Sequence, residues 1–481
     1  MPGPGGTNTM VGQPQTPLAT INNVPIEVFY SIILLVTLQG QVEGYYDRLR
    51  TLRLVAASWS ALIDDYPQCW SIISSSQPES IWRMALQKSQ SADIDVDSGS
   101  IDVPKHHQTR LVEAIVDHMQ RVRKLSILDR DLEYLIASAP TAPRLRSLHL
   151  RRGLDDEDSI ALSIHPAQWA PNLRDVDLYC SRLIWKEPLW NSLERLRIQS
   201  GGWAEGLPME GISTVLQASP GLRILSLTGI LRPTYQRTLP VVRLDALENL
   251  KLDTPTQSSP LEVLNSIVAL PSSCAVYFDA EDESRRREIL RSVYKLVPQT
   301  ANDVEGANLL KFAAGIYGCR FRIEGFDVLM YSETPGKVDP LETFTHVMEG
   351  LPAQRCSAVK SVEIYDTDFA CVLGLLPIVS SFCRNTSDLT IPALNDNLAT
   401  AIGGTSNGWL FSRLESISVS RYWGGHHAVK VAQFRLQAFE AGRQVAKLKK
   451  ITLSSFRLRK EDELELAKLQ ALVPELVVTH P

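Results

Sequence analysis

The sequence has few cysteines and lacks several short motifs that mark common classes of enzyme. Its 7 cysteines are scattered, and no C-x-x-C pair occurs among them. An odd number without paired spacing favours a reducing compartment over a disulfide framework. The patterns G-x-x-x-x-G-K-[ST] and H-E-x-x-H are missing, and the glycine-rich segment Gly403–Gly408 lacks a phosphate-binding lysine, so a loop is expected there. We therefore predict a non-catalytic chain that uses no metal and no cofactor.

The chain also lacks a large net charge and a long hydrophobic run. Its formal net charge is −5, so no nucleic-acid partner is expected. The apolar run Val28–Leu38 is too short to span a membrane, and no membrane association is expected. Residues 1–20 are rich in proline and glycine without a positive region, which predicts a disordered tail rather than a signal peptide. The remaining composition is that of a soluble globular protein.

Between Val24 and Trp70, apolar residues recur with the spacing of α-helices. Pro25 suits the first position of a helix because its missing N–H would be unpaired there, and Glu27 is favourable near the positive end of the helix dipole. The first apolar series comprises Val28, Ile32, Leu35 and Val36, and the second comprises Leu52, Val55, Trp59 and Leu62. Each series keeps to one helical face, and Pro67 ends the second. We predict two short amphipathic helices joined by a polar loop.

This stretch resembles an F-box domain. The residues that carry the resemblance are Val24, Pro25, Glu27, Ile32, Ile33, Leu52, Val55, Trp59 and Trp70. Their order, and their spacing at the two ends, match the family pattern. The chain departs from that pattern at Ala56–Ser58, and the segment Gln39–Asp47 is longer and more polar than a compact F-box needs. The alternative is an unrelated N-terminal helical hairpin whose tryptophans only fill a core.

The resemblance implies an F-box domain over residues 21–75 that binds a Skp-type adaptor and, through it, a cullin-based ubiquitin ligase. The adaptor-facing side chains that it implies are Pro25, Ile26, Leu52, Val55 and Trp59. Apolar residues left exposed on so small a unit are better explained by a partner than by solubility. A cytoplasmic or nuclear protein is expected. Residues 76–91 are predicted to form a connecting helix.

A repeated pattern, x-L-x-x-L-x-L, is the strongest signal in the rest of the chain. The copies are Val122/Leu125/Ile127, Leu145/Leu148/Leu150, Leu173/Val176/Leu178, Leu193/Leu196/Ile198, Leu222/Leu225/Leu227, Leu247/Leu250/Leu252, Val359/Val362/Ile364, Leu414/Ile417/Val419 and Leu448/Ile451/Leu453. In the best-preserved part they begin about 20 to 29 residues apart, which is the period of leucine-rich repeats. The last two apolar residues of a copy are two apart, so both point to one side of a strand, and stacked copies bury a shared core.

We therefore predict an α/β fold in which residues 92–481 form an irregular leucine-rich-repeat solenoid. It would have a parallel strand ladder and carry helices or loops on its convex side. Strands are also expected at Ala92–Asp97, with Ile94 inward, at Cys274–Phe278, around Phe321, and at Pro474–Val478 as a final edge. Helices are expected at Leu341–Met348, Phe369–Cys383, Val429–Phe439 and Glu461–Leu472. A separate C-terminal α/β domain is the alternative to a continuous solenoid.

An N-terminal F-box followed by degenerate leucine-rich repeats resembles the large F-box families of mushroom-forming fungi, and Leu270–Asp279 resembles their middle region. Side chains that alternate with the core leucines should line the concave strand face, and a protein target would bind there. They are His149, Arg151, Asp177, Tyr179, Arg195, Arg197, Gln199, Asn249, Lys251 and Asp253. The expected function is that of a substrate receptor in a ubiquitin ligase. The alternative is an interaction scaffold that acts outside any ligase.

Overall fold

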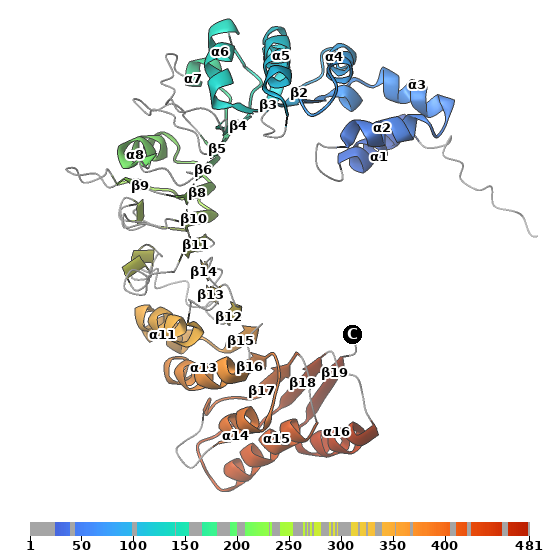
Figure 1. Ribbon diagram of the computed structural model, residues 1–481. Coiled ribbons are helices and arrows are strands. Elements are labelled where there is room, and N and C mark those ends of the chain that lie inside the picture. The colour runs from blue at the N-terminus through green and yellow to red at the C-terminus, as the bar shows by residue number, and fades with distance from the viewer. Residues whose placement is uncertain are drawn as a thin grey trace, which may run out of the picture. The chain divides into compact units, whose positions relative to one another are not determined.

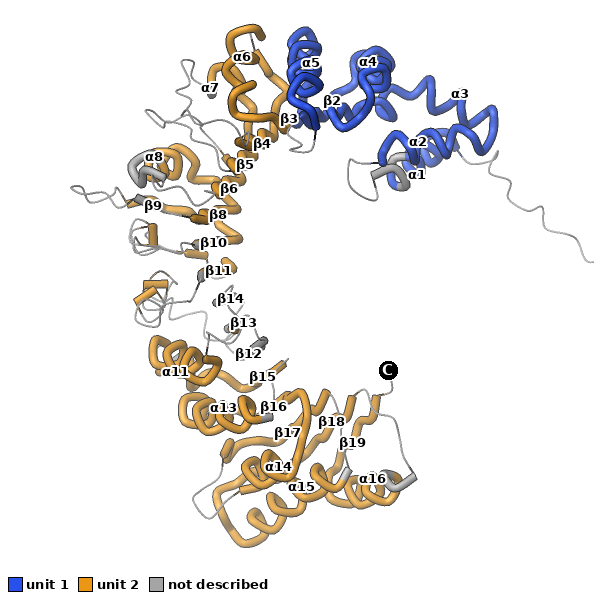
Figure 2. Tube along the Cα trace, viewed as in Figure 1, with its two compact units in different colours: residues 1–125 blue, residues 126–481 orange. Residues whose placement is uncertain are grey.

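The structure is a computed structural model whose chain divides into two compact units, Met1–Leu125 (unit 1) and Ser126–Pro481 (unit 2) (Figure 2). It describes residues 25–38, 44–98, 103–139, 141–152, 166–179, 193–199, 207–229, 231–232, 241–253, 263–264, 267, 270–271, 274–279, 288–289, 292–293, 296, 309–315, 318–323, 326–331, 339–351, 353–365, 369–404, 410–420, 425–454 and 460–479. The tail predicted over residues 1–20 lies outside these ranges. Residues 92–125 of the predicted solenoid, including the strand predicted at Ala92–Asp97, belong to unit 1.

Unit 1 begins with α1 (Ile26–Leu38), α2 (Tyr45–Arg53) and α3 (Ala57–Asp65), followed by the 3-10 turn η2 (Pro67–Trp70) (Figure 1). The prediction of two helices is wrong, because the second apolar series is divided between α2 and α3. Ala56 adopts an extended conformation with φ −156° and ψ 150°, which interrupts the helical hydrogen bonds. The break lets α3 pack back against α2 instead of continuing away from it.

The core of unit 1 is aromatic and aliphatic, and strands follow its helices. Its buried side chains include Phe29, Ile33, Tyr45, Leu49, Ile63 and Trp70. The remaining elements are β1 (Ile72–Ser74), α4 (Glu79–Lys88), β2 (Ile94–Asp97), α5 (Lys105–Ile115), the 3-10 turn η3 (Val116–Arg121) and β3 (Val122–Leu128), which crosses the boundary between the units. β1 pairs in parallel with β2, so α4 is a crossover helix. The predicted helix and the strand with Ile94 inward are confirmed.

One carboxylate ties the helices of unit 1 together. Asp64 on α3 accepts hydrogen bonds from Arg53 on α2 and from Lys88 on α4, each at 2.7 Å. Both cations also lie over the ring of Trp70, at 5.7 and 4.5 Å from its centroid. Burial raises the pKa of Asp64, but the hydrogen bonds from Lys88 and Arg53 outweigh burial and leave that pKa below its ordinary value.

Replacing Asp64 with asparagine should weaken unit 1 by about 1–2 kcal/mol at pH 7, a figure reduced for partial exposure. Because the folded-state pKa of Asp64 lies below the unfolded-state value of about 3.9, its stabilisation is present above roughly pH 4. It is lost as pH falls through the folded-state pKa. Pulsed hydrogen exchange in a series of urea concentrations, at pH 7 and at pH 3, gives the unfolding midpoint of peptides over residues 57–88 in each chain. Equal midpoints for the two chains at pH 7 would contradict it.

Unit 2 is built on one extended sheet with helices along one side (Figure 1). Neighbouring strands pair in the order β4 (Ser147–Arg151), β5 (Asp175–Tyr179), β6 (Arg195–Gln199), β8 (Ile224–Thr228), β10 (Asn249–Asp253), β11 (Ala275–Asp279), β14 (Phe326–Tyr331), β13 (Gly318–Ile323), β12 (Leu309–Gly315), β15 (Ser361–Tyr365), β16 (Asp388–Ile391), β17 (Ser416–Val419), β18 (Lys450–Ser454) and β19 (Glu475–Thr479). A short pair, β7 (Leu207–Pro208) and β9 (Leu231–Arg232), stands apart.

The helices of unit 2 lie between successive strands in the chain. They are α6 (Asp129–Ser138), α7 (Pro166–Trp169), α8 (Met209–Ala218), α11 (Pro340–Gly350), α12 (Ala353–Ala358), α13 (Phe369–Phe382), α14 (Asp396–Gly403), α15 (Gly425–Glu440) and α16 (Lys460–Leu472). The last four pack in chain order, each against the next. The helices predicted for the C-terminal part are confirmed. Strand β12 pairs directly with β15, so the sheet continues without a break into that part.

The apolar residues of the repeated pattern form rows across the sheet. One row runs through Leu148, Val176, Leu196, Leu225, Leu250 and Val276, and the next through Leu150, Leu178, Ile198, Leu227, Leu252 and Phe278. All of these side chains are buried. Each contributes about 1.5–3 kcal/mol of hydrophobic stabilisation relative to an exposed side chain. The predicted strands, and the inward direction of their leucines, are confirmed.

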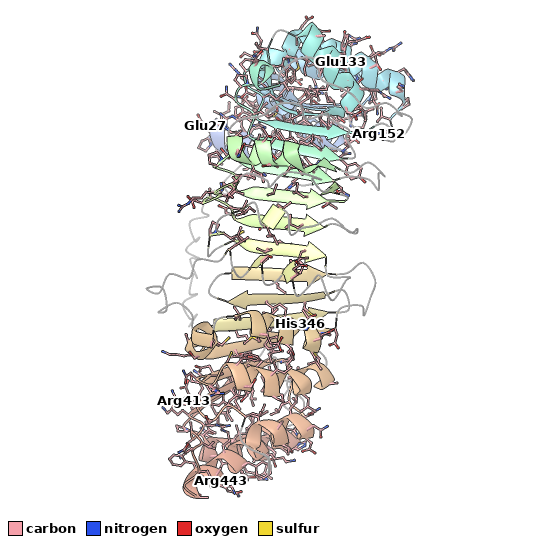
Figure 3. The ribbon with its side chains drawn as sticks, turned by 90° about the vertical axis from the view of Figure 1, so that its left-hand side faces the viewer. Glu27, Glu133, Arg152, His346, Arg413 and Arg443 are labelled. Atoms are coloured by element: carbon pink, nitrogen blue, oxygen red, sulfur yellow. The ribbon has the colours of Figure 1, made fainter. Side chains whose placement is uncertain are left out.

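A parallel ladder was predicted throughout, and this is wrong at β13. β13 pairs antiparallel with both β12 and β14, and one strand arrow in Figure 3 accordingly points against the rest. The register pairs Gly315 with Gly318 and Ile323 with Phe326, so two residues join each pair of strands. Connections this short can only make hairpins, because parallel neighbours need a long crossover. The reversed order of β12, β13 and β14 in the sheet follows from the pairing of β14 with β11 and of β12 with β15.

A buried arginine holds the C-terminal repeats together. Arg435 on α15 is 0% exposed. Its guanidinium donates hydrogen bonds to the backbone carbonyls of Ile402, Leu410, Phe411, Leu414 and Ala446, at 3.2, 3.4, 2.9, 3.4 and 3.5 Å. These carbonyls lie at the end of α14, in the turn before β17 and in the segment before β18. Burial lowers the pKa of Arg435 to about 10, which still leaves it protonated at neutral pH.

Candidate protein-binding surfaces

Helix α1 presents apolar side chains on two faces. Phe29 and Ile33 point into unit 1 and are buried. Val28, Ile32 and Leu35 lie on a different face and are exposed, Leu35 by 63%. Glu27 is the only charged residue of the helix. A helix that is apolar on more than one face normally has more than one apolar neighbour, so the outer face of α1 has the character of an interface.

The turn between α2 and α3 adds a second exposed apolar group. Leu54 is 78% exposed and Val55 is 59% exposed, and both side chains lie where the chain passes from one helix to the other. Ile26, at the start of α1, is also exposed. Soluble proteins rarely expose several large apolar side chains on one small unit unless they bind a partner. We call Ile26, Val28, Ile32, Leu35, Leu54 and Val55 the apolar face of unit 1.

The predicted adaptor-facing residues occupy different positions in the structure. Pro25, Ile26 and Val55 are exposed, as a binding role requires. Leu52 and Trp59 are half-buried, and the ring of Trp59 packs edge-on against Phe29 with centroids 5.1 Å apart. Trp59 therefore contributes to the packing of α1 on α3. Sequence reasoning did not single out Leu54, because the turn that exposes it was predicted to be part of one continuous helix.

The predicted target-binding residues form rows on the sheet face opposite the leucines. Register places His149, Asp177, Arg197 and Lys251 in one row, and Arg151, Tyr179, Gln199 and Asp253 in the next. Asn249 and Arg195 belong to a third row, with Asp175 and Ser147. None of the side chains in these rows whose exposure is described is buried, and the side chain of Asp253 lies outside that set. The structure thus brings together residues that lie as much as a hundred positions apart in the sequence.

A hydrogen-bond network orients the polar side chains on β4 to β6. The hydroxyl of Ser147 lies 3.0 Å from Nε2 of His149, and Nδ1 of His149 lies 3.4 Å from Asp177. Ser147 also lies 3.3 Å from Asp175, and Asp175 pairs with Arg195 at 3.4 Å. A serine nucleophile would need oxyanion donors beside it, whereas Ser147 lies within a strand whose backbone is paired in the sheet. The network is suited to holding side chains in fixed positions for contact with a partner.

A G-x-S-x-G pattern was predicted to be absent, and this is wrong, because the glycine-rich segment contains a match at Gly404–Gly408. In α/β-hydrolases this pattern follows a strand and opens a helix, which exposes the serine. Here it follows α14 and precedes β17, so the order is reversed. Residues 405–408 lie outside the described residues.

Within the described ranges no group of three or more His, Cys, Asp or Glu side chains is arranged to hold a metal ion. None of the described helices is long and apolar enough to cross a lipid bilayer. A scan of the sequence against protein-family models gives no match, and neither does a search of curated protein sequences. The two surfaces described above are therefore the candidate functional sites.

Proposed function

We propose that the chain is a substrate-recognition subunit of a Skp–cullin–F-box type ubiquitin ligase. Unit 1 would serve as the F-box that binds a Skp-type adaptor, and the strands of unit 2 would form a leucine-rich-repeat surface that binds a protein target. The subunit performs no bond chemistry in this proposal. It raises the effective concentration of the target at the ligase, which is a proximity effect.

The observation that carries the proposal is the apolar face of unit 1. It lies on the helices that carry the F-box resemblance, and it includes Ile26 and Val55, two of the residues that the resemblance assigns to the adaptor. Contact with water alone does not explain why the exposed residues Val28, Ile32 and Leu35 of α1 are apolar. An adaptor that covers this face provides that reason.

The sheet face of unit 2 supports the second half of the proposal. Tyr179, Arg151 and Arg197 are exposed on adjacent strands, and Tyr and Arg are the side chains that most often anchor protein interfaces. The network around His149 fixes neighbouring side chains, which lowers the entropy lost on binding. A polar protein surface is the partner that this mixture of charges fits.

The test is a co-elution experiment with the full chain. Purified chain is mixed with a recombinant Skp-type adaptor, and then with a cullin N-terminal domain, and each mixture is analysed by size-exclusion chromatography with light scattering. The proposal predicts a 1:1 complex with the adaptor and a ternary complex after the cullin is added. Separate elution of a chain that circular dichroism shows to be folded contradicts it, and would favour a scaffold outside any ligase.

A further inference from the structure

The strand β19, at one end of the sheet in unit 2, has an open edge. It pairs in parallel with β18, and within the described part of the chain no strand pairs with its other side (Figure 1). The N–H of Glu475 donates to the carbonyl of Lys449 at 3.0 Å, so the backbone groups of Glu475 face β18. Successive residues of a strand direct their backbone groups to opposite sides. The N–H and C=O groups of Leu476 and Val478 are therefore directed to the open edge.

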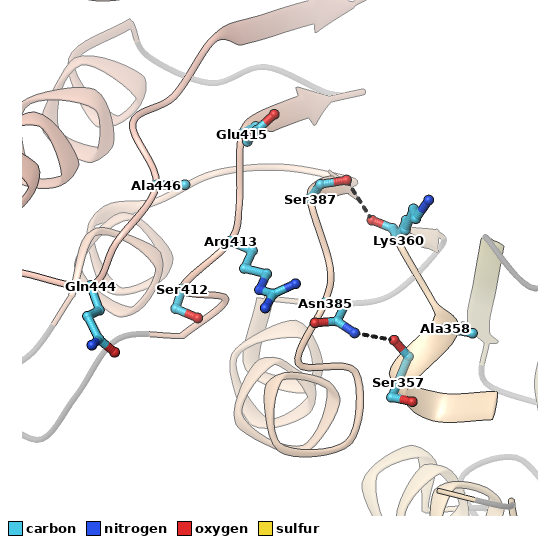
Figure 4. Close-up of a pocket in the computed structure, with 10 residues that line it drawn as sticks. All are labelled: Ser357, Ala358, Lys360, Asn385, Ser387, Ser412, Arg413, Glu415, Gln444 and Ala446. Atoms are coloured by element: carbon cyan, nitrogen blue, oxygen red, sulfur yellow. Dashed lines mark hydrogen bonds between the residues drawn. The ribbon is translucent and has the colours of Figure 1, made fainter. Parts of the chain in front are cut away.

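In the C-terminal part of the sheet, each repeat donates hydrogen bonds to the repeat before it. The side-chain amide of Asn385 donates to the carbonyl of Ser357 at 2.6 Å (Figure 4). The backbone amide of Ser387 donates to the carbonyl of Lys360 at 2.8 Å. The amide of Glu475 is the last donor of this series among the described residues. The repeat that contains β19 is therefore joined to a neighbour on one side only.

The inward side chains of β19 are less covered than those of the strand before it. Register aligns Leu476 with Ile451 and Val478 with Leu453. Ile451 is 1% exposed and Leu453 is 0% exposed, whereas Leu476 and Val478 are only half-buried. The apolar core of the repeats therefore reaches the edge of the sheet, and the described residues do not close it there.

Strand β19 lacks the features by which proteins protect an exposed edge. Its 5 residues include no lysine and no proline, and its one-to-one register with β18 leaves no bulge. Its central residue, Val477, is aligned with Thr452 on the open face of the sheet and is apolar all the same. An unprotected edge of this kind is a template for pairing with another strand.

A second copy of β19 fits this edge in antiparallel orientation. A two-fold axis at Val477 places Leu476 of each copy opposite Val478 of the other. Both residues direct their backbone groups to the edge, so each such pair exchanges two hydrogen bonds. The axis is perpendicular to the sheet, so inward side chains of one copy meet inward side chains of the other. The half-buried ends of the two cores are then covered by each other.

The charges and the sequence both favour this register. Glu475 lies opposite Thr479 of the second copy, so no like charges meet across the strand pair. An axis at Leu476 would instead put Val478 opposite Pro474, which has no N–H to donate. A two-fold pairing occupies the β19 edge of both copies, so the assembly ends at a dimer. We propose that the chain forms a dimer through antiparallel pairing of β19 with β19 of a second copy.

The experiment is sedimentation velocity of the full chain over a range of concentrations. Because a single pair of strands buries little surface, a weak dimer with a dissociation constant of about 1–100 μM is expected. The weight-average mass should rise with concentration from 53.5 kDa towards twice that value. Val477→Lys should weaken the dimer at least about tenfold, because two like charges meet at the axis. Circular dichroism verifies that each variant is folded.

Two further samples separate this register from a general effect of charge. Ser418→Lys is the matched control, because Ser418 lies in the same row as Val477 but two strands further from the edge. Its like charges would lie about 24 Å apart, beyond the Debye length of about 8 Å, so the dimer should weaken less than about twofold. Val477→Glu should be as weak a dimer as Val477→Lys, but an equimolar mixture of the two should dimerise because opposite charges meet.

Three outcomes overturn the proposal. The first is a mass of 53.5 kDa at every concentration, which would leave the edge to a strand of a different protein. The second is equal dimerisation of Val477→Lys and Ser418→Lys, and the third is a mixture that dimerises no better than its components. Adaptor and cullin are absent from this experiment. A dimer would still carry one adaptor per chain, so the ratio expected in the co-elution test is unchanged.

Discussion

Replacing Arg435 with methionine is expected to cost at least about 3 kcal/mol of stability in the C-terminal repeats. Methionine has a similar length and fills much of the same space, but it donates no hydrogen bond. Removing the guanidinium leaves the carbonyls of Ile402 and Leu414 buried without it, whereas the Phe411 carbonyl keeps the N–H of Leu414 at 3.0 Å. Each buried acceptor that loses its partner costs about 1–3 kcal/mol. Chemical denaturation, followed by hydrogen exchange of peptides over residues 396–454, measures the loss.

Two companion variants separate the lost hydrogen bonds from general damage to α15. Gln437→Met makes a comparable change at an exposed position on the same helix and should alter stability by less than about 0.5 kcal/mol. Arg435→Lys keeps the charge but presents a single nitrogen, which cannot reach carbonyls in three segments, so an intermediate loss is expected. If Arg435→Met is as stable as Gln437→Met, the structural role assigned to Arg435 is wrong.

The double variant Leu35→Asp/Val55→Asp should lower the affinity for a Skp-type adaptor by more than about a hundredfold while the chain stays folded. Both side chains are more than half exposed, so charge at these positions disturbs little within unit 1. In a complex, two carboxylates would be buried against an apolar partner, and burial of an unpaired charge costs several kcal/mol. Isothermal titration calorimetry measures the affinity, and thermal unfolding verifies the fold. Leu52→Asp is a poorer choice, because Leu52 is half-buried.

Leu464→Asp is the matched control for the double variant. Leu464 lies on α16 of unit 2 and is 64% exposed, much like Leu35. Its replacement should leave adaptor affinity unchanged within about twofold, because the residue lies outside the proposed interface. An equal loss of affinity for the control and the double variant would mean that the effect comes from general surface charge. It would show that the apolar face of unit 1 is not the adaptor-binding surface.

Much of unit 2 could be predicted because its signal is repeated. The last two apolar residues of each copy lie two apart, which fixes both the strand and its inward face, as at Leu148 and Leu150. Register then places the intervening residues, such as His149, on the open face without further information. The antiparallel strands were missed because the repeat was expected to continue. The available signal was the pair Gly315 and Gly318, which have two residues between them, the spacing of a tight hairpin.

Unit 1 shows where spacing alone is insufficient. The helical period predicts α1 correctly, but it cannot decide whether Val28 or Phe29 faces the core, since both lie on apolar faces. The series from Leu52 to Leu62 stays in helical phase across the break at Ala56, so the break leaves no periodic trace. Arg435 could not be predicted to be buried, because arginine is almost never fully buried and its partners are backbone carbonyls that carry no sequence signal.

The most direct test of the central claim is hydrogen exchange of the full chain with and without a Skp-type adaptor. We expect peptides over residues 26–38 and 52–57 to become protected when the adaptor is added, because the apolar face of unit 1 is covered. Peptides over β4 to β10 should exchange as before, since that face is reserved for a target. Protection confined to unit 2, or no protection at saturating adaptor, would contradict the claim that unit 1 is the adaptor-binding surface.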